Sequence, residues 1–129
     1  MFDAGNLGAL TPAYASYEML KGEEPDIRDD IYALGCMTYE LLSGKHPFDK
    51  IPADEARDKR LRPIKINSIS KRQWKAIEKA LAFERKDRIE TVDLFYHELT
   101  NKKKSRLWIF LLVILMGSIT VAGIINMKN

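Results

Sequence analysis

The sequence from Asp30 to Phe48, DIYALGCMTYELLSGKHPF, combines an apolar helical pattern with a sharp stop. Its helical spacing is carried by Ile31, Leu34, Met37, Thr38, Leu41 and Leu42. Gly44 follows this pattern, and a glycine just past the last helical residue commonly ends a helix. We therefore predict a largely buried helix from Asp30 to Ser43.

Further helical patterns lie on both sides of this stretch. The spacing predicts a helical turn over 14–20 and a polar helix over 53–60, with Gly, Pro and charged residues interrupting at 21–26. Ser70 and Gln73 have the spacing of a capping box, ahead of an apolar face formed by Trp74, Ile77 and Leu81. Thr91 is placed to cap a last helix, with an apolar face of Val92, Phe95, Tyr96 and Leu99. No alternating strand pattern occurs, so we predict an all-α fold.

Charge and composition exclude several classes of function. The 129 residues hold 21 Lys and Arg against 18 Asp and Glu, a near balance that does not indicate nucleic-acid binding. Cys36 is the single cysteine and lies in the apolar helical pattern, which favours buried packing over a reactive thiol. His46 and His97 stand apart from any cysteine or carboxylate at ligand spacing, so no metal site is predicted.

The sequence from Leu107 to Ile125 contains no charged residue. As a helix it would extend about 28 Å, enough to cross the hydrocarbon core of a bilayer. A basic juxtamembrane segment, 102–106, precedes it, whereas the short tail 126–129 carries only Lys128. This asymmetry predicts a single-pass membrane protein whose soluble region, residues 1–101, faces the cytoplasm.

Four sequence motifs lie in order and in register over residues 9–100. Residues 11–18, TPAYASYE, resemble the end of an activation segment, T-P-x-Y-x-A-P-E, except that Ser16 and Tyr17 replace Ala-Pro. Residues 30–35 resemble D-x-x-S-x-G, and residues 39–48 are similar to Y-E-L-L-x-G-x-x-P-F. Residues 84–88, ERKDR, lie between two predicted helices, where kinases place an arginine that pairs with the glutamate of A-P-E. Together the four motifs resemble those of serine/threonine protein kinases of bacterial type. The resemblance implies that the soluble region, residues 1–101, is the helical C-lobe of a protein-kinase-like fold.

The resemblance also implies roles for particular residues. Thr11 would position the substrate hydroxyl, with a plain turn residue as the alternative. Glu18 and Arg88 would form a buried ion pair, the alternative being two solvated surface charges. Asp30 would be the buried aspartate that holds the catalytic-loop backbone, a helix cap being the other role open to it. Gly35 is the glycine of the same motif.

Kinase chemistry also needs a glycine-rich loop, a strand lysine, an H-R-D catalytic loop and a metal-binding D-F-G, and none of these occurs in the 129 residues. We therefore assign no catalytic residue and no bound cofactor to this chain, although ATP, Mg²⁺ and protein substrates are implied for a complete kinase. The chain is expected to be a truncated or incomplete copy of a membrane-anchored kinase, inactive alone. The alternative is a non-catalytic, membrane-held docking or regulatory module.

Overall fold

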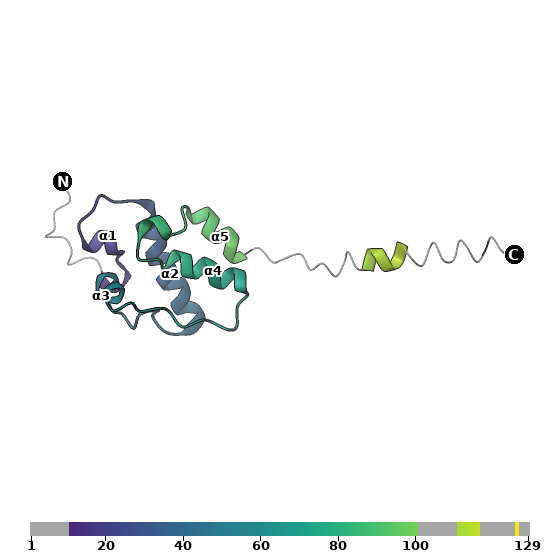
Figure 1. The fold of residues 1–129 in the computed structure, drawn as a ribbon, viewed down its shortest axis with the longest axis horizontal. Helices are drawn as coiled ribbons and strands as arrows, with labels where there is room; N and C mark the ends of the chain where they lie inside the picture. The colour runs from purple at the N-terminus through teal and green to yellow at the C-terminus, as the bar shows by residue number, and fades with distance from the viewer. Residues whose placement is uncertain (1–10, 101–110, 117–125, 127–129) are drawn as a thin grey trace.

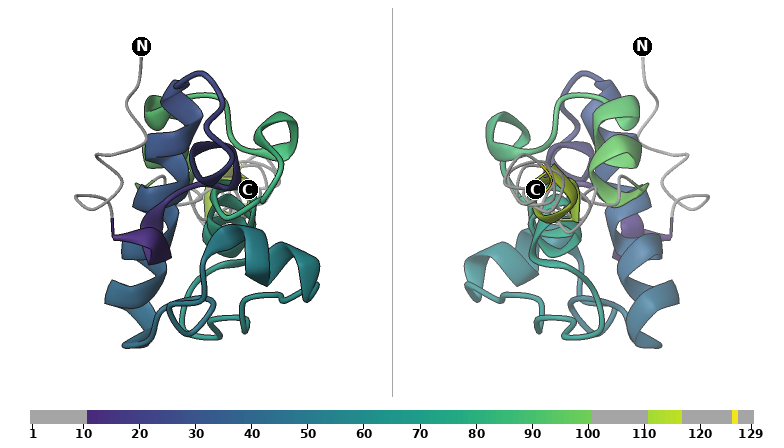
Figure 2. Two further views of the ribbon diagram at one scale, coloured as in Figure 1. Left: turned by 90° about the vertical axis from the view of Figure 1, so that its left-hand side faces the viewer. Right: turned by 90° about the vertical axis from the view of Figure 1, so that its right-hand side faces the viewer.

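The computed structural model describes residues 11–100, 111–116 and 126. Residues 11–100 fold into α1 (Tyr17–Leu20), α2 (Ile27–Ser43), α3 (Ala53–Asp58), α4 (Lys71–Ala80) and α5 (Val92–Thr100), with 3₁₀ turns at Pro12–Tyr14 and Arg85–Asp87 (Figure 1). No residue of the described ranges lies in a strand, which confirms the all-α prediction for them. Among the described helices α2 is the longest, and it runs along one side of the helical region, as the turned views show (Figure 2).

The start of α2 differs from the prediction. The helix begins at Ile27 rather than at Asp30, because Asp26 caps it. The Asp26 carboxylate accepts a hydrogen bond from the Arg28 backbone N–H at 2.9 Å. In return, the Asp29 side chain accepts from the Asp26 backbone N–H at 2.9 Å, which completes a capping box. The helix ends at the predicted glycine, Gly44, whose φ is 75°.

The buried face of α2 is also not the predicted one. The face that packs into the core is formed by Ile31, Tyr32, Gly35, Cys36 and Tyr39. Of the residues expected to be buried, Met37 is 47% exposed, Leu41 87% and Leu42 46%. The helix carries apolar side chains on most of its sides, so the spacing of these residues could not show which side is buried. Cys36 is buried as predicted, and burial raises the pKa of its thiol to about 12.

The packing of α4 selects the buried face of α2. A Cβ atom added to Gly35 would lie 2.9 Å from the Cβ of Ala80, so the two helices approach closely at this glycine. The predicted capping box is present at the start of α4. Ser70 Oγ accepts from the Gln73 N–H at 3.2 Å, and Gln73 Oε1 accepts from the Ser70 N–H at 3.0 Å. The predicted face is buried, at Trp74, Ile77 and Leu81.

The last helix of this region, α5, packs against α4. Thr91 Oγ1 accepts a hydrogen bond from the Leu94 N–H at 3.1 Å, as expected of the predicted cap. Of the predicted apolar face, Phe95 is buried and Leu99 half-buried, whereas Val92 and Tyr96 are exposed. The expected face is therefore only partly correct, since Phe95 is the buried residue of α5.

The predicted transmembrane helix, 107–125, falls mostly outside the described residues, as do 102–106 and all of the tail except residue 126. Residues 111–116 are helical and exposed. In the described portion of the chain, no helix has both the length and the apolar character needed to cross a bilayer. The membrane segment therefore stays a prediction.

Candidate functional site

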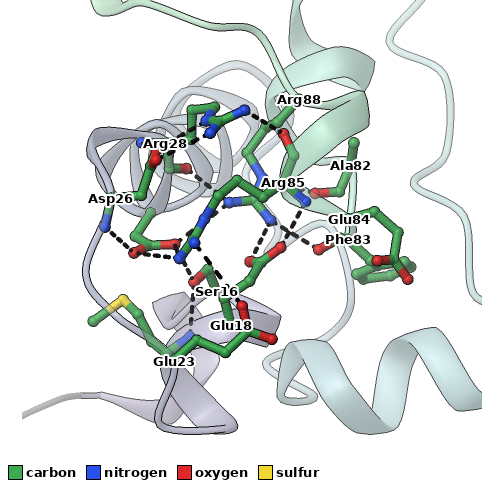
Figure 3. A network of polar contacts seen from close by, with 12 residues as sticks. Ser16, Glu18, Glu23, Asp26, Arg28, Ala82, Phe83, Glu84, Arg85 and Arg88 are labelled. Atoms are coloured by element: carbon green, nitrogen blue, oxygen red, sulfur yellow. Dashed lines mark hydrogen bonds and ion pairs between the residues drawn. The ribbon is translucent and has the colours of Figure 1, made fainter.

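A buried ion pair joins α1 to the segment before α5. Glu18 Oε2 lies 2.7 Å from Arg88 Nη2, and the two side chains are only 5% and 0% exposed (Figure 3). The predicted contact between these residues, which lie 70 positions apart, is therefore present. Reading the two as solvated surface charges is wrong.

Every nitrogen of the Arg88 guanidinium has a hydrogen-bond acceptor. Nε donates to the Ala82 carbonyl at 2.9 Å, and Nη1 donates to the Arg28 carbonyl at 2.8 Å. Nη2 donates to the Phe83 carbonyl at 2.8 Å as well as to Glu18. The guanidinium therefore binds the backbone of two segments, at Arg28 and at Ala82 with Phe83, as well as the Glu18 carboxylate.

The Glu18 carboxylate is held from two directions. Its second oxygen, Oε1, accepts a hydrogen bond from the Arg85 backbone N–H. Burial alone would raise the pKa of the Glu18 carboxyl, but hydrogen bonds and the Arg88 charge outweigh burial, so the pKa lies below its usual value. The Glu18 carboxyl is therefore ionised at neutral pH.

A second acid–base pair extends this cluster, and sequence reasoning missed it. Arg85 Nη2 lies 3.2 Å from each carboxylate oxygen of Asp29, which is only 5% exposed. Ser16 Oγ donates to Asp29 Oδ1 at 2.8 Å. Arg28 and Asp26 pair beside them at 2.9 Å (Figure 3). The acidic spacing of Asp26 and Asp29 was the available signal for the buried carboxylate, because it marks a helix start.

Ser16 also explains how the turn before Glu18 forms without the family's proline. Its hydroxyl accepts a hydrogen bond from the Met19 backbone N–H at 3.1 Å and thereby caps α1. A serine at this position supplies the helix start that proline would otherwise favour through its fixed φ. The same hydroxyl donates to Asp29, so one side chain serves α1 and α2 together.

The prediction that Asp30 is buried is wrong for this structure. Its side chain is exposed, and the buried aspartate is its neighbour Asp29. Asp30 does not cap the helix either, since Asp26 occupies that position. Among the described residues, none forms a side-chain hydrogen bond with Asp30. Its proposed contact with a catalytic loop therefore stays a prediction.

Thr11 lies at the edge of the described residues and is exposed. Its carbonyl accepts from the Tyr14 N–H at 3.0 Å, and its side chain does not cap the turn that follows. Nearby, the Tyr14 hydroxyl donates to Glu40 Oε2 at 2.6 Å, which ties this turn to α2. The substrate-positioning role of Thr11 stays a prediction.

His46 is a further residue whose role the sequence did not reveal. Its Nδ1 accepts from the backbone N–H groups of Lys50 at 2.9 Å and Phe48 at 3.1 Å, so the proton of the neutral ring lies on Nε2. Nε2 then donates to the Ala13 carbonyl at 2.9 Å. Burial lowers the pKa of this imidazole, and the neutral ring clamps the loop after α2 to the turn that carries Ala13.

The buried cluster does not fit a nucleotide with its metal. The carboxylates of Glu18 and Asp29 are occupied by Arg88 and Arg85. Among the described residues, no three His, Cys, Asp or Glu side chains come together in a way that could hold a metal ion. The cluster is therefore suited to joining backbone segments rather than to binding ATP with Mg²⁺.

Comparison with known proteins agrees with the motifs. Residues 6–109 match the family described as the protein kinase domain. Over 39 residues the chain is 51% identical to the probable serine/threonine-protein kinase PknB of Corynebacterium glutamicum, covering 30% of this chain and 6% of that protein. Over 52 residues it is 50% identical to the PknB of Mycolicibacterium smegmatis and 42% to that of Mycobacterium tuberculosis, in each case 36% of this chain and 8% of the relative.

The matched stretches thus cover less than a tenth of these relatives' length. The family match, by contrast, extends over most of this chain and includes both residues of the buried ion pair. The helical structure of residues 11–100, the four motifs in register and the family match lead to one assignment: the chain belongs to the protein kinase domain family.

Proposed function

We propose that this chain forms the substrate-side portion of the C-lobe of a serine/threonine protein kinase, which transfers the γ-phosphate of ATP to Ser or Thr of protein substrates. The supporting observation is the buried pair of Glu18 and Arg88. It ties α1, which follows the turn after Thr11, to the segment before α5, so the chain just beyond the predicted substrate position has a fixed support. In this role the pair positions groups and takes no part in the chemistry.

We further propose that residues 107–125 cross a membrane and that the helical region lies on the cytoplasmic side. The sequence supports this with its uncharged run and with the basic segment 102–106 on one side only. ATP, Mg²⁺ and the catalytic base would be supplied by kinase elements that are not among these 129 residues.

A membrane-held docking or regulatory module is the second candidate. The observation that favours it is the uncovered apolar face of α2, where Leu41 is 87% exposed and Met37 47%. A binding partner could cover this face. In the first proposal the same face is covered by the remainder of a kinase domain.

A chimeric kinase tests the first proposal. Residues 11–100 replace the corresponding stretch of the Mycolicibacterium smegmatis relative, and transfer of labelled phosphate to a generic basic protein is measured. We expect transfer by the chimera and a large loss on Glu18→Ala. Glu23→Ala is the matched control, because Glu23 is exposed and reaches Arg85 only at 3.9 Å.

Folding of the chimera is followed separately by thermal melting and by ATP binding. A chimera that melts cooperatively and binds ATP, yet transfers no phosphate, would contradict the kinase role and favour the docking module.

A further inference from the structure

A basic groove lies between α4 and α5, away from the buried ion pairs. It encloses about 640 Å³, and the charged side chains that line it are Lys71, Arg72, Lys75, Lys79 and Glu98. Ala76, Ile89 and Leu94 form its apolar wall. The proposed kinase role uses none of these side chains.

The three lysines of the groove form a row of positive charge on one helix. Lys71, Lys75 and Lys79 follow one another at intervals of four along α4, so they lie on one side of the helix, and all three are exposed. Like charges at this spacing repel each other and destabilise a helix. None of the three has an ion pair in the described portion of the chain, since Glu98, the one carboxylate lining the groove, is held by Arg72 at 2.6 Å. An external anion would relieve this repulsion.

The row lies close to the point from which the chain continues toward its apolar segment. Gln73 Nε2 donates to the Leu99 carbonyl at 2.8 Å, so the end of α5 lies beside the first turn of α4. Thr100 is the last residue of α5, and the sequence continues with three lysines at 102–104 and with Arg106. The row from Lys71 to Lys79 is about 12 Å long. The link from Thr100 to Leu107 spans at most about 25 Å.

We propose that the lysine row on α4, formed by Lys71, Lys75 and Lys79, contacts the phosphate groups of anionic lipids and holds this face of the domain against the membrane surface. The proposal rests on the proposed membrane anchor, which brings the row within reach of the bilayer. Lysines near an anionic leaflet each contribute about fivefold to binding, and the attraction fades beyond a Debye length of roughly 10 Å. The row therefore adds positive charge on the folded domain to the positive charge of segment 102–106.

Lysine reactivity measures this contact directly. The full chain is mixed with vesicles of phosphatidylcholine alone or with three-tenths phosphatidylglycerol, treated briefly with an amine-acetylating reagent, and analysed by mass spectrometry at each lysine. We expect Lys71, Lys75 and Lys79 to lose reactivity several-fold on the anionic vesicles and to regain it in high salt. Lys45 and Lys65, exposed elsewhere on the domain, serve as internal controls and should not change.

A charge reversal within the row gives a matched pair of variants. Lys75→Glu should abolish the protection of Lys71 and Lys79, whereas Lys65→Glu, an equal charge change at another exposed position, should leave it intact. Protection of the row by inorganic phosphate without vesicles, to the same extent, would assign the groove to a soluble phosphate and contradict the lipid contact.

Equal reactivity of the three lysines on the two vesicle types would overturn the proposal. This result is separable from a failure of the anchor, because flotation of the chain with pure phosphatidylcholine vesicles tests the anchor. It is equally separable from a failure of the kinase role, which only phosphate transfer by the chimera tests.

Discussion

At the scale of single residues, loss of the Glu18–Arg88 ion pair should lower the stability of the fold strongly. Arg88→Ala leaves a buried carboxylate without its partner, and Glu18→Ala leaves a buried guanidinium, so each should lower the free energy of unfolding by about 3–5 kcal/mol. The double variant should cost less than the sum, because removing the second charge no longer leaves one unpaired. Urea unfolding of the full chain and its three variants in mild detergent measures this. Additive losses would show that the two residues are not coupled.

His46 gives the stability of the fold a pH dependence. Its pKa is lowered by burial, so the unfolded chain binds a proton at a higher pH than the folded chain. The contribution of His46 to the free energy of unfolding should therefore be fully present above about pH 6.5, the ordinary pKa of histidine. It should decrease as the pH falls below that value. Unfolding between pH 7.5 and 5.5 should show this fall, and His46→Gln should flatten it. His97→Gln is the control, since that side chain is exposed; an unchanged slope in His46→Gln would contradict the assignment.

The residues of the site differ in how far the sequence could reveal them. Glu18 and Arg88 could be paired because each lies in its own recognisable motif. The contact between Asp29 and Arg85 joins residues 56 positions apart and depends on where α2 begins. The sequence pattern predicts that start at Asp30, three residues later than the observed Ile27. In the sequence Ser16 is visible only as a departure from Ala-Pro, since its capping of α1 and its hydrogen bond to Asp29 arise only in the folded chain.

At the scale of helices, Gly35 sets how closely α2 and α4 pack. Gly35→Ala would place a methyl group 2.9 Å from the Ala80 Cβ, and overpacking of this kind typically costs about 1–3 kcal/mol. We expect a lower melting temperature by circular dichroism of the full chain. Ala80→Gly in the same chain removes the clashing methyl and should recover some of the loss. A double variant no more stable than Gly35→Ala would show that the strain lies elsewhere.

The helices also show which sequence signals were sufficient. For α4, the capping box and the apolar face agreed on one helix start and one buried side, and both are present in the structure. For α2, apolar residues occur on several sides, and the close approach at Gly35 decided which side is buried. A three-dimensional contact of this kind leaves no periodicity in the sequence, so Met37 and Leu41 were placed on the wrong side.

At the scale of the whole chain, phosphate transfer should be absent without further kinase elements. Catalysis of this reaction consists almost entirely of positioning ATP, metal and hydroxyl and of stabilising charge. The described carboxylates at the buried site are already held by guanidinium groups, and the sequence has no H-R-D or D-F-G to replace them. With ATP and Mg²⁺, the full chain should therefore show no rise in melting temperature and should transfer no labelled phosphate to a generic basic protein. The Mycolicibacterium smegmatis relative, assayed alongside, is the positive control. Turnover by the chain itself, abolished by Glu18→Ala, would mean that these 129 residues hold a catalytic site that neither the motifs nor the described side chains reveal.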